Sequence, residues 1–374
     1  MRGCTSIVAG MLLAATLGTP HGAALAAEEP GVFGFQWEND AFQFGDDHYT
    51  NGLRFAYVPR TNQLAWLHTQ ARKLAAVDRH MQALEERFFP GSGRARTASD
   101  NPSPDRSRVT LLLGQSMFTP NKMLRDETGY AAIAADRPYA GWLYGGLALH
   151  RPFNDNHGLT TVEFDVGVVG PKSFAADVQT WWHNVNGWAP FLGWEHQIPT
   201  EPTLQLSFRR SQILTQLATA AAPAPLGLTS DVLWDYGFSL GSPHTMAAAN
   251  MRIRVGLDLP NDFGPARIRP AISGYDVFET GLRHAYAFVG VGAQATLYDA
   301  FLDGTLFHDS PRVSKRPGVV EAQLGVVVPL KVVRVGATVV RRSREFDGPW
   351  GEVEEFWSLS FSLLCAAQPK VACY

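Results

Sequence analysis

Residues 161–168 read TVEFDVGV, and this stretch decides the fold. Apolar residues occupy every second position, and polar or very small residues occupy the positions between them. The apolar set is Val162, Phe164, Val166 and Val168, and the other set is Thr161, Glu163, Asp165 and Gly167. Successive side chains of a β-strand point to opposite faces, so the segment predicts a strand with one apolar face. The same alternation returns at 50–57, 251–258, 320–328 and 357–363.

Strands of this kind can be assembled in two ways. A water-soluble sandwich buries the apolar faces, whereas a membrane barrel turns them toward lipid and keeps the polar faces in its lumen. Here the polar faces carry charges and glycines, and many segments approach the length that crosses a bilayer. Aromatic residues stand at segment ends, namely Trp37, Tyr57, Trp142 and Trp357, as in an interfacial girdle. We therefore predict an all-β fold, a transmembrane antiparallel up-and-down β-barrel.

The predicted barrel has about 12 strands, an even number as such barrels require. The segments are 31–39, 50–58, 108–115, 140–151, 158–169, 202–213, 230–241, 245–258, 282–297, 318–329, 332–342 and 355–364. Two further stretches, 63–89 and 173–186, have helical spacing.

The order of the strands predicts which loops share an end of the barrel. If the first strand starts in the periplasm, the loops 40–49, 116–139, 170–201, 298–317 and 343–354 all lie outside the cell. A short helix at 173–186 is then extracellular, and the helical and loop insert 59–107 faces the periplasm. Because nearly every polar constellation of the chain falls in the outer loops, their convergence indicates a functional site.

The ends of the chain carry their own signals. Arg2, an apolar run over 7–17 and the stretch Ala24-Leu25-Ala26 predict a secretory signal peptide over 1–27, with the barrel in 28–374. A membrane anchor is the alternative. Export permits a disulfide between Cys365 and Cys373, although two free thiols are also compatible with the sequence. The 374 residues carry a net charge of −3, which gives no electrostatic support for a nucleic-acid partner.

Oxygen-bearing side chains cluster where the first two predicted strands meet. The strand at 31–39 ends in Asn39 and is followed by Asp40, and the next strand opens with Thr50 after a short acidic loop. Carboxylate, amide and hydroxyl oxygens gathered at one point form the ligand set that calcium prefers. An ordinary polar hairpin loop is the alternative.

A candidate base lies in the helix predicted at 173–186. Gln179 and His183 are four residues apart and share a face of that helix. Histidine is the usual general base near neutral pH, although a surface histidine would give the same pattern. No good Ser/His/Asp set has all its members on one side of the predicted barrel, so a base that activates water fits the residues better. Arg137 suits a phosphate, or else forms a surface pair with Asp136.

Taken together, the motifs resemble the outer-membrane lipid A 3-O-deacylase family. The matching pieces are Glu38-Asn39-Asp40, Tyr49-Thr50-Asn51-Gly52, Asp136-Arg137-Pro138-Tyr139-Ala140-Gly141, Gly170-Pro171, Gln179, His183, Gly193-Trp194, Gln197, Phe301-Leu302-Asp303-Gly304 and the run 341–346. Their order and spacing cover most of the mature chain, from about residue 31 to 363. The chain departs from the family pattern in the long insert 59–107 and in the tail after residue 364.

The resemblance implies a calcium-dependent hydrolase in the bacterial outer membrane. Such an enzyme removes the 3′-linked acyloxyacyl chain from lipid A, so lipopolysaccharide and outer-membrane lipids are the expected partners. It implies Asp40 as a calcium ligand with Asn39 and Thr50 beside it. It also implies His183 as the base that activates water, supported by Gln179.

Three further expectations stand beside that reading. Arg137 and Tyr139 are the predicted substrate-binding residues. A passive channel or binding barrel is one alternative function. A calcium-dependent outer-membrane phospholipase is another, although such an enzyme would be expected to use a serine nucleophile, and no convincing serine is present.

Overall fold

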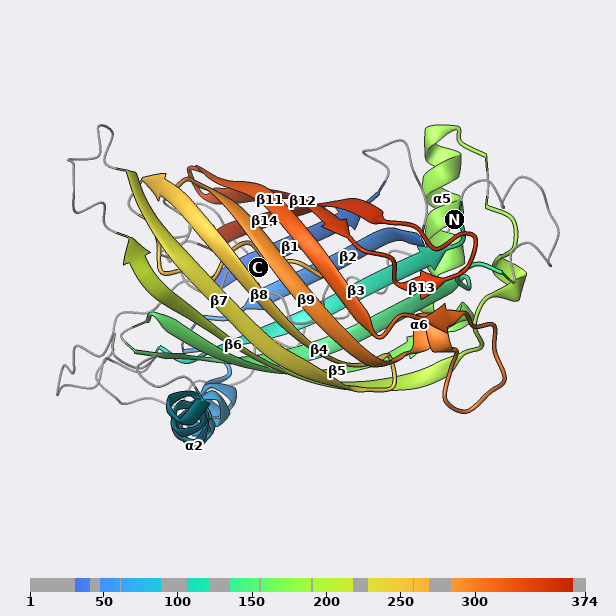
Figure 1. Cartoon of the computed structure of the whole chain (residues 1–374). Helices are drawn as coiled ribbons and strands as arrows, with labels where there is room; N and C mark the ends of the chain where they lie inside the picture. Colours follow the sequence, from blue (N-terminus) through green and yellow to red (C-terminus); the bar gives the residue numbers. More distant parts are fainter. Residues whose placement is uncertain are drawn as a thin grey trace.

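The chain folds into one closed β-barrel in which each strand pairs antiparallel with its neighbours (Figure 1). The computed structural model describes residues 31–40, 48–60, 62–88, 106–121, 135–154, 156–189, 191–217, 228–257, 259–268 and 284–365. The barrel strands are β1 (Gly31–Asn39), β2 (His48–Val58), β3 (Arg108–Thr119), β4 (Ala140–Phe153), β5 (Gly158–Val169), β6 (Glu201–Leu217), β7 (Leu228–Gly241), β8 (His244–Leu257), β9 (Tyr286–Asp299), β11 (Gly318–Leu330), β12 (Val333–Arg342) and β14 (Glu354–Cys365). Every strand predicted from the sequence is confirmed, and the first closes the barrel against the last.

The alternation in the sequence becomes an inner and an outer wall. Along β11, outward-facing Val320, Leu324 and Val326 are exposed by 60%, 63% and 48%, while the alternate residues Glu321, Gln323 and Gly325 are buried. The outer wall is therefore a lipid-facing apolar surface, as in membrane barrels. One expectation is wrong: Trp142 is not part of an outer girdle. It points into the lumen and stacks on Tyr144, with ring centroids 4.1 Å apart.

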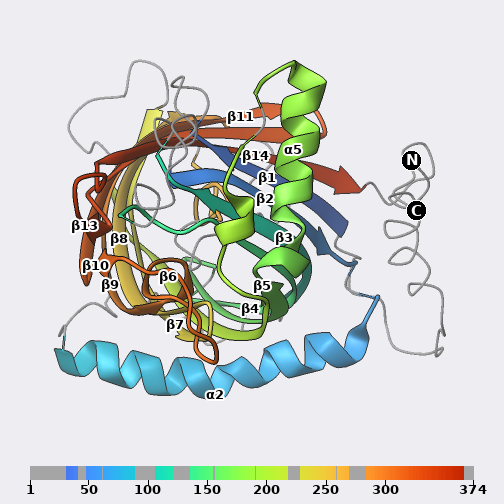
Figure 2. The ribbon, with the colours of Figure 1, turned by 90° about the vertical axis from the view of Figure 1, so that its right-hand side faces the viewer.

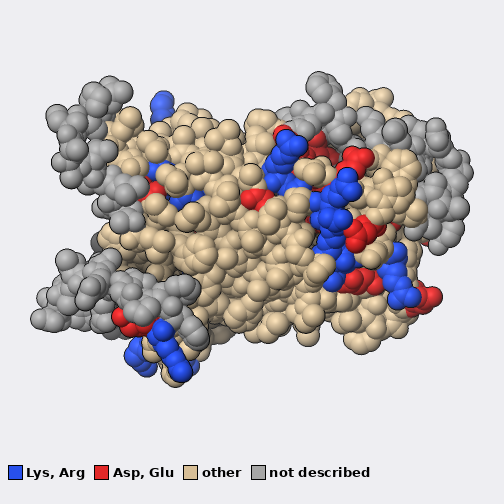
Figure 3. Space-filling model, viewed as in Figure 1, with Lys and Arg blue, Asp and Glu red and all other residues tan. Residues whose placement is uncertain are grey.

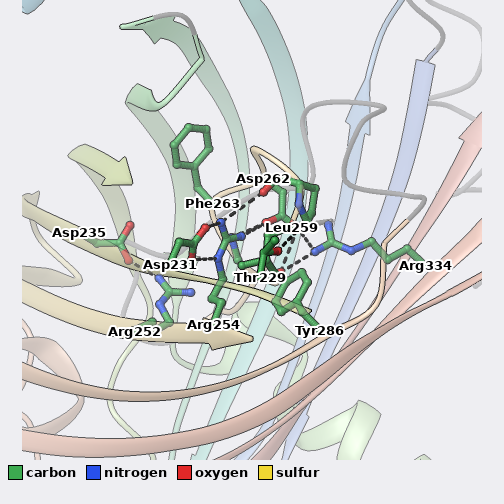
Figure 4. A network of polar contacts seen from close by, with 12 residues as sticks. Thr229, Asp231, Asp235, Arg252, Arg254, Leu259, Asp262, Phe263, Tyr286 and Arg334 are labelled. Carbon is green, nitrogen blue, oxygen red and sulfur yellow. Dashed lines mark hydrogen bonds and ion pairs between the residues drawn. The ribbon is translucent and has the colours of Figure 1, made fainter. Parts of the chain in front are cut away.

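Charged side chains and an inserted segment fill the lumen. Arg254 bonds Asp231 and Asp262, and Arg334 and Tyr286 bond the same Asp262, as Figure 4 shows. Asp262 belongs to the segment 259–268, which follows β8 and crosses the lumen. Its far end is held by β1 and β2, where Ile268 donates to Glu38 and Arg54 donates to the carbonyl of residue 267.

Two long helices lie across the barrel axis at opposite ends (Figures 1 and 2). They are α2 (Ala65–Phe88) and α5 (Ala175–Asn186), so both helices predicted from the sequence are confirmed. The remaining elements are η3 (Pro171–Ser173), η4 (Trp194–His196), α6 (Ala300–Asp303), and the short strands β10 (Ser314–Lys315) and β13 (Phe346–Asp347), which pair with each other. The two ends are called below the α5 end and the α2 end.

The helices and loops divide between the ends as the strand order predicts. The connections after β1, β3, β5, β9 and β12 share the α5 end, and α2, which follows β2, lies at the other. No described helix is both long and apolar enough to cross a membrane. The predicted signal peptide and the predicted disulfide lie outside the described residues and side chains.

Candidate active site

The polar end of β1 presents one set of residues to the lumen and the alternate set to the outer wall. Gln36 and Glu38 point inward, since Gln36 accepts a hydrogen bond from luminal Arg54 at 2.8 Å and Glu38 accepts one from Ser358 at 3.0 Å. Alternation along the strand then turns Trp37 and Asn39 to the outer wall. Residues at this end of β1 are therefore placed where a lipid can reach the barrel.

An oxygen-rich cluster forms where β1, β2 and β3 end. The Asn39 amide donates to the Thr50 carbonyl oxygen at 2.8 Å, and the hydroxyls of Thr50 and Thr119 are 2.6 Å apart. Asp40 follows at once and is 5% exposed. The structure thus brings Asn39 and Thr50 into contact, and Asp40, the third residue predicted as a metal ligand, is buried next to Asn39 in the chain.

The donor set of this cluster fits a hard cation. It offers carboxylate, amide, hydroxyl and backbone oxygens, which are the ligands that calcium takes. No group of three or more His, Cys, Asp or Glu side chains gathers within the described part of the chain. A cation held here would therefore use Asp40 together with neutral oxygens, for which Asn39 and Thr50 are suitable. The acidic residues 46 and 47 lie outside the described residues.

The backbone around α5 is shaped by residues in left-handed conformation. Gly170 (φ 78°) and Phe174 (φ 59°) turn the chain into η3 and then into α5, and Gly187 (φ 69°) caps the C-terminus of the helix. Asp177 in the first turn complements the helix dipole. The buried face carries Ala175, Gln179 and His183, which confirms that the predicted pair shares a face.

That face packs against the outer wall of the barrel. Gln115 of β3, which points outward, donates to the carbonyl oxygen of Ser173 at 2.6 Å. Outward-facing Met117 joins Ala175 in an apolar cluster. Gly141 of β4 lies directly under this contact, and a Cβ atom there would collide with Ser173 and Ala175. The absence of a side chain at Gly141 lets α5 approach the wall closely.

His183 is oriented by a backbone carbonyl. Its Nδ1 is 2.7 Å from the carbonyl oxygen of Ala189, which fixes the proton on Nδ1 and leaves the lone pair on Nε2. The edges of Phe191 and Trp188 contact the ring, with centroid distances of 4.5 and 5.5 Å. This is the tautomer that a base needs if it takes a proton through Nε2.

Gln179 is oriented by an indole. Trp194 donates its Nε1–H to Gln179 Oε1 at 2.8 Å, and because an indole can only donate, this contact fixes which end of the amide is oxygen. Gln179 Nε2 is buried and has no hydrogen-bond partner among the described residues. It therefore presents a donor to the space between α5 and the wall.

An aromatic contact joins the two halves of the site. Trp182, next to His183, packs edge-on against Trp37, with ring centroids 6.5 Å apart. Trp37 lies two residues before Asn39, so α5 covers the end of β1 that carries the oxygen cluster. The histidine and the candidate metal ligands thus belong to one region of the outer wall.

The two predicted substrate-binding residues take different places. Tyr139 is buried against Trp194, with ring centroids 4.9 Å apart, and its hydroxyl donates to the Leu192 carbonyl. Arg137 lies in another cluster, paired with Glu345 at 3.4 Å and Glu354 at 3.1 Å. Its Nε and Nη2 have no hydrogen-bond partner within the described ranges, but its side chain is fully buried.

Some of these contacts have no clear signal in the sequence. Trp194 and the Gln179 side chain that it orients are separated by a loop, so no local spacing predicts their contact. Only the Gly193-Trp194 motif pointed to Trp194. The two carboxylates that hold Arg137 come from the far end of the chain. Thr119 could have been found, since it ends β3 beside the predicted ligands.

The sequence pattern of the family described as outer membrane protein LpxR matches residues 7–364 of this chain. The chain belongs to the LpxR family. This is the lipid A 3-O-deacylase family that the motifs resemble. No curated protein sequence matches the chain.

The fold agrees with a solved LpxR structure. LpxR from Salmonella typhimurium is similar over 89% of this chain and 99% of its own, with a TM-score of 0.66 and 16% sequence identity. Two other outer-membrane barrels are less similar. The β domain of the Bordetella autotransporter BrkA has 8% identity and a TM-score of 0.40 over 90% of this chain and 99% of its own. An outer membrane channel from Pseudomonas putida has 9% sequence identity and a TM-score of 0.40, over 93% of this chain and 100% of its own.

Proposed function

We propose that this LpxR-family protein is an outer-membrane hydrolase that removes the 3′-linked acyloxyacyl chain from lipid A. The observation that carries the proposal is the place of His183 and Gln179. Both are held between α5 and the lipid-facing wall, beside the end of β1. Lipid A occupies the outer leaflet, so the proposal takes the α5 end as extracellular. The ester of a membrane lipid can then reach these groups from the side of the barrel.

In the proposed reaction, His183 is the general base. Its Nε2 accepts a proton from water, and the water oxygen forms a bond to the ester carbonyl carbon. Collapse of the tetrahedral intermediate breaks the bond between that carbon and the sugar oxygen. The imidazolium returns the proton to that oxygen, which leaves a sugar hydroxyl and a free carboxylic acid. General-base help of this kind contributes roughly 10²–10⁴ in rate.

The oxygen cluster supplies the second part of the proposal. Asp40, Asn39 and Thr50 would hold a calcium ion, which stabilises negative charge on an oxyanion when it is bound. Gln179 Nε2 would donate a hydrogen bond to an oxygen of the substrate or of the attacking water. Tyr139 positions Gln179 indirectly, because it packs against the Trp194 indole that fixes the amide.

The contents of the lumen count against a passive channel. The segment 259–268 crosses the interior and is tied to both sides of the barrel. Arginines are paired with carboxylates at successive levels, as in Arg209–Asp235 and Arg342–Glu321. A channel needs a continuous water-filled path, and these described groups occupy the interior instead.

Mass spectrometry of lipid A tests the proposal. Cells that carry the chain should lose the 3′-linked acyloxyacyl group, and the purified protein in detergent with calcium should release it. Cells that carry His183→Ala should keep it. Release of fatty acids from glycerophospholipids, with lipid A intact, would favour the phospholipase alternative. No release from either lipid, with the wild-type barrel folded, would overturn the proposed hydrolase.

A further inference from the structure

The second helix, α2, also lies on the outer wall of the barrel. Its buried face meets side chains of β4 to β7 that point away from the lumen. Arg210 is completely buried there: it donates to Glu85 at 2.6 Å and to Asp78 at 2.9 Å, and its guanidinium stacks 3.7 Å from the Phe153 ring centroid. These contacts fix α2 against the lipid-facing side of the barrel.

The wall changes character just beyond this contact. The outward residues of β5, β6 and β7 that hydrogen-bond to α2 or its carboxylates are polar, namely Thr160, Arg210, Gln212 and Tyr236. Two residues along the same strands toward the α5 end, the outward residues are Val162, Phe208 and Phe238. Two residues of a strand span about 7 Å, which is less than the diameter of a helix. The helix therefore lies at the edge of the apolar belt, where a bilayer has its headgroups.

The exposed flanks of α2 differ from each other. Helical spacing places Trp66, Lys73, Val77 and Leu84 along one flank, with Trp66 exposed by 64% and Leu84 by 46%. Arg72, Arg79 and Glu86 lie along the other flank. One flank of the helix is thus mainly apolar, with Lys73 as its one charged member, and the opposite flank is charged.

The direction of the chain decides which flank faces the membrane. In Figure 2, α2 runs from right to left beneath the barrel, seen from the α5 end. A right-handed helix on that course turns the flank of Trp66 and Leu84 toward the apolar belt, and the flank of Arg79 away from it. Figure 3 shows the uncharged band around the middle of the barrel, with charged side chains toward both ends of the molecule.

The charges that stay exposed on α2 are mainly basic. Asp78 and Glu85 are neutralised by Arg210, and Asp78 also by Arg151. The exposed charged residues are Arg72, Lys73, Arg79, Glu86 and Arg87. A basic helix with an apolar flank at headgroup level has the composition of a helix that lies in an anionic membrane surface.

We propose that α2 is an interfacial helix that binds anionic phospholipid in the periplasmic leaflet of the outer membrane. Trp66, Val77 and Leu84 enter the boundary between headgroups and acyl chains. The basic residues meet the phosphate groups. The assignment of the leaflet rests on the orientation in the proposed function, whereas the lipid contact itself rests on the packing of α2 alone.

Fluorescence in vesicles tests the lipid contact without any lipid A. The full-length protein is reconstituted in phosphatidylcholine that contains a minor fraction of dibrominated phosphatidylcholine or dibrominated phosphatidylglycerol. Brominated lipid should quench a component of the emission that Trp66→Phe removes. If Trp66→Phe leaves lipid quenching unchanged and instead removes a component quenched by aqueous iodide, the flank faces water and the proposal fails.

The anion preference has its own control. Dibrominated phosphatidylglycerol should quench Trp66 more than the same fraction of dibrominated phosphatidylcholine. The double variant Arg79→Glu with Arg87→Glu should lower the preference of the lipid around Trp66 for phosphatidylglycerol over phosphatidylcholine at least tenfold. Each basic residue at an anionic surface contributes roughly fivefold to the affinity for that surface. Lys331→Glu, in the turn between β11 and β12 at the same end, should leave this preference unchanged. An equal preference in all three proteins would overturn phospholipid recognition by α2.

Discussion

Two helices lie across the outer wall of this barrel, and different kinds of contact hold them there. The α2 interface buries Leu67, Ala71 and Leu74 and adds an ionic network that α5 lacks among the described residues. In that network Arg210 joins two carboxylates of the helix, and Tyr236 and Gln212 bond one of them. The α5 interface is apolar and close, built over Gly141 and Met117. At α5 a buried amide donor of Gln179 has no partner among the described residues.

Each interface contains a buried histidine held in the same way. His68 of α2 has Nδ1 3.1 Å from the carbonyl oxygen of Ser107, and His183 of α5 has Nδ1 2.7 Å from that of Ala189. Burial lowers the pKa of His68, with smaller contributions from nearby Arg108 and Arg72, so this ring is neutral at pH 7. The comparison teaches that a buried, oriented histidine does not by itself make a site. What distinguishes α5 is the neighbouring amide donor and the oxygen cluster of β1.

The largest expected effect separates the two histidines. His183→Ala should lower lipid A ester hydrolysis by roughly 10²–10⁴, because the general base is lost. His68→Ala should leave turnover within about twofold, since His68 lies at the other end of the barrel. Turnover is measured in detergent with calcium, and heat-modifiable gel mobility reports folding. Equal losses of turnover from both substitutions would contradict a specific catalytic role for His183.

The ionic interface is expected to dominate stability. Arg210→Ala leaves the carboxylates of Asp78 and Glu85 without their shared partner, which should cost about 3–5 kcal/mol. The unfolding temperature in heat-modifiability gels should fall, while the folded fraction keeps its lipid A turnover. A matched substitution in the lumen, Arg209→Ala, removes the pair with Asp235 and serves as the comparison. If Arg210→Ala left unfolding unchanged, the α2 contact would be dispensable.

Calcium-dependent turnover should depend on Asp40 at the α5 end of the barrel and not on the carboxylates of α2. Asp40→Asn keeps the shape of the side chain but removes its charge, so turnover should fall by about 10²–10³ if the oxyanion loses its stabilising group. Chelation should have a similar effect on the wild type, reversed by added calcium. Asp78→Asn on α2 is the charge-matched control and should retain calcium-dependent turnover. Full activity of the wild type in chelator would rule out a role for the cation.

The smallest expected effect concerns the amide. Gln179→Leu removes the Nε2 donor and should lower turnover by about fivefold, the value of one hydrogen bond of roughly 1 kcal/mol. Trp194→Phe removes the donor that orients the amide but keeps an aromatic ring against Tyr139, so a smaller loss of the same kind is expected. A Trp194→Phe loss as large as that of His183→Ala would show that the loop itself has collapsed.

The sequence predicts the strands better than their surroundings, for a physical reason. A strand with one face toward lipid and one toward the lumen must alternate, so segments such as 318–329 could be placed almost to the residue. Trp142 failed as a girdle residue because an aromatic at a strand end can point to either face. The segment 259–268 could not be placed either, since no local pattern requires it to cross the lumen.

The candidate site was predictable in part. Gln179 and His183 share a face because helical spacing sets that relation locally, and Asn39 and Thr50 meet because two neighbouring strands end together. Their location on the outer wall was not predictable. It depends on Gly141, whose missing side chain matters only once the loop after β5 folds back across β4.

The outward direction of Asn39 has a kinetic consequence. A reactive region on the flank of a barrel meets membrane lipids by lateral diffusion in two dimensions. The quantity that saturates such an enzyme is the mole fraction of substrate in the leaflet, and its concentration in the bulk solution is irrelevant. Diluting the surface with inert lipid should therefore slow the reaction at a fixed total amount of substrate, whereas diluting whole vesicles with buffer should leave turnover per barrel unchanged.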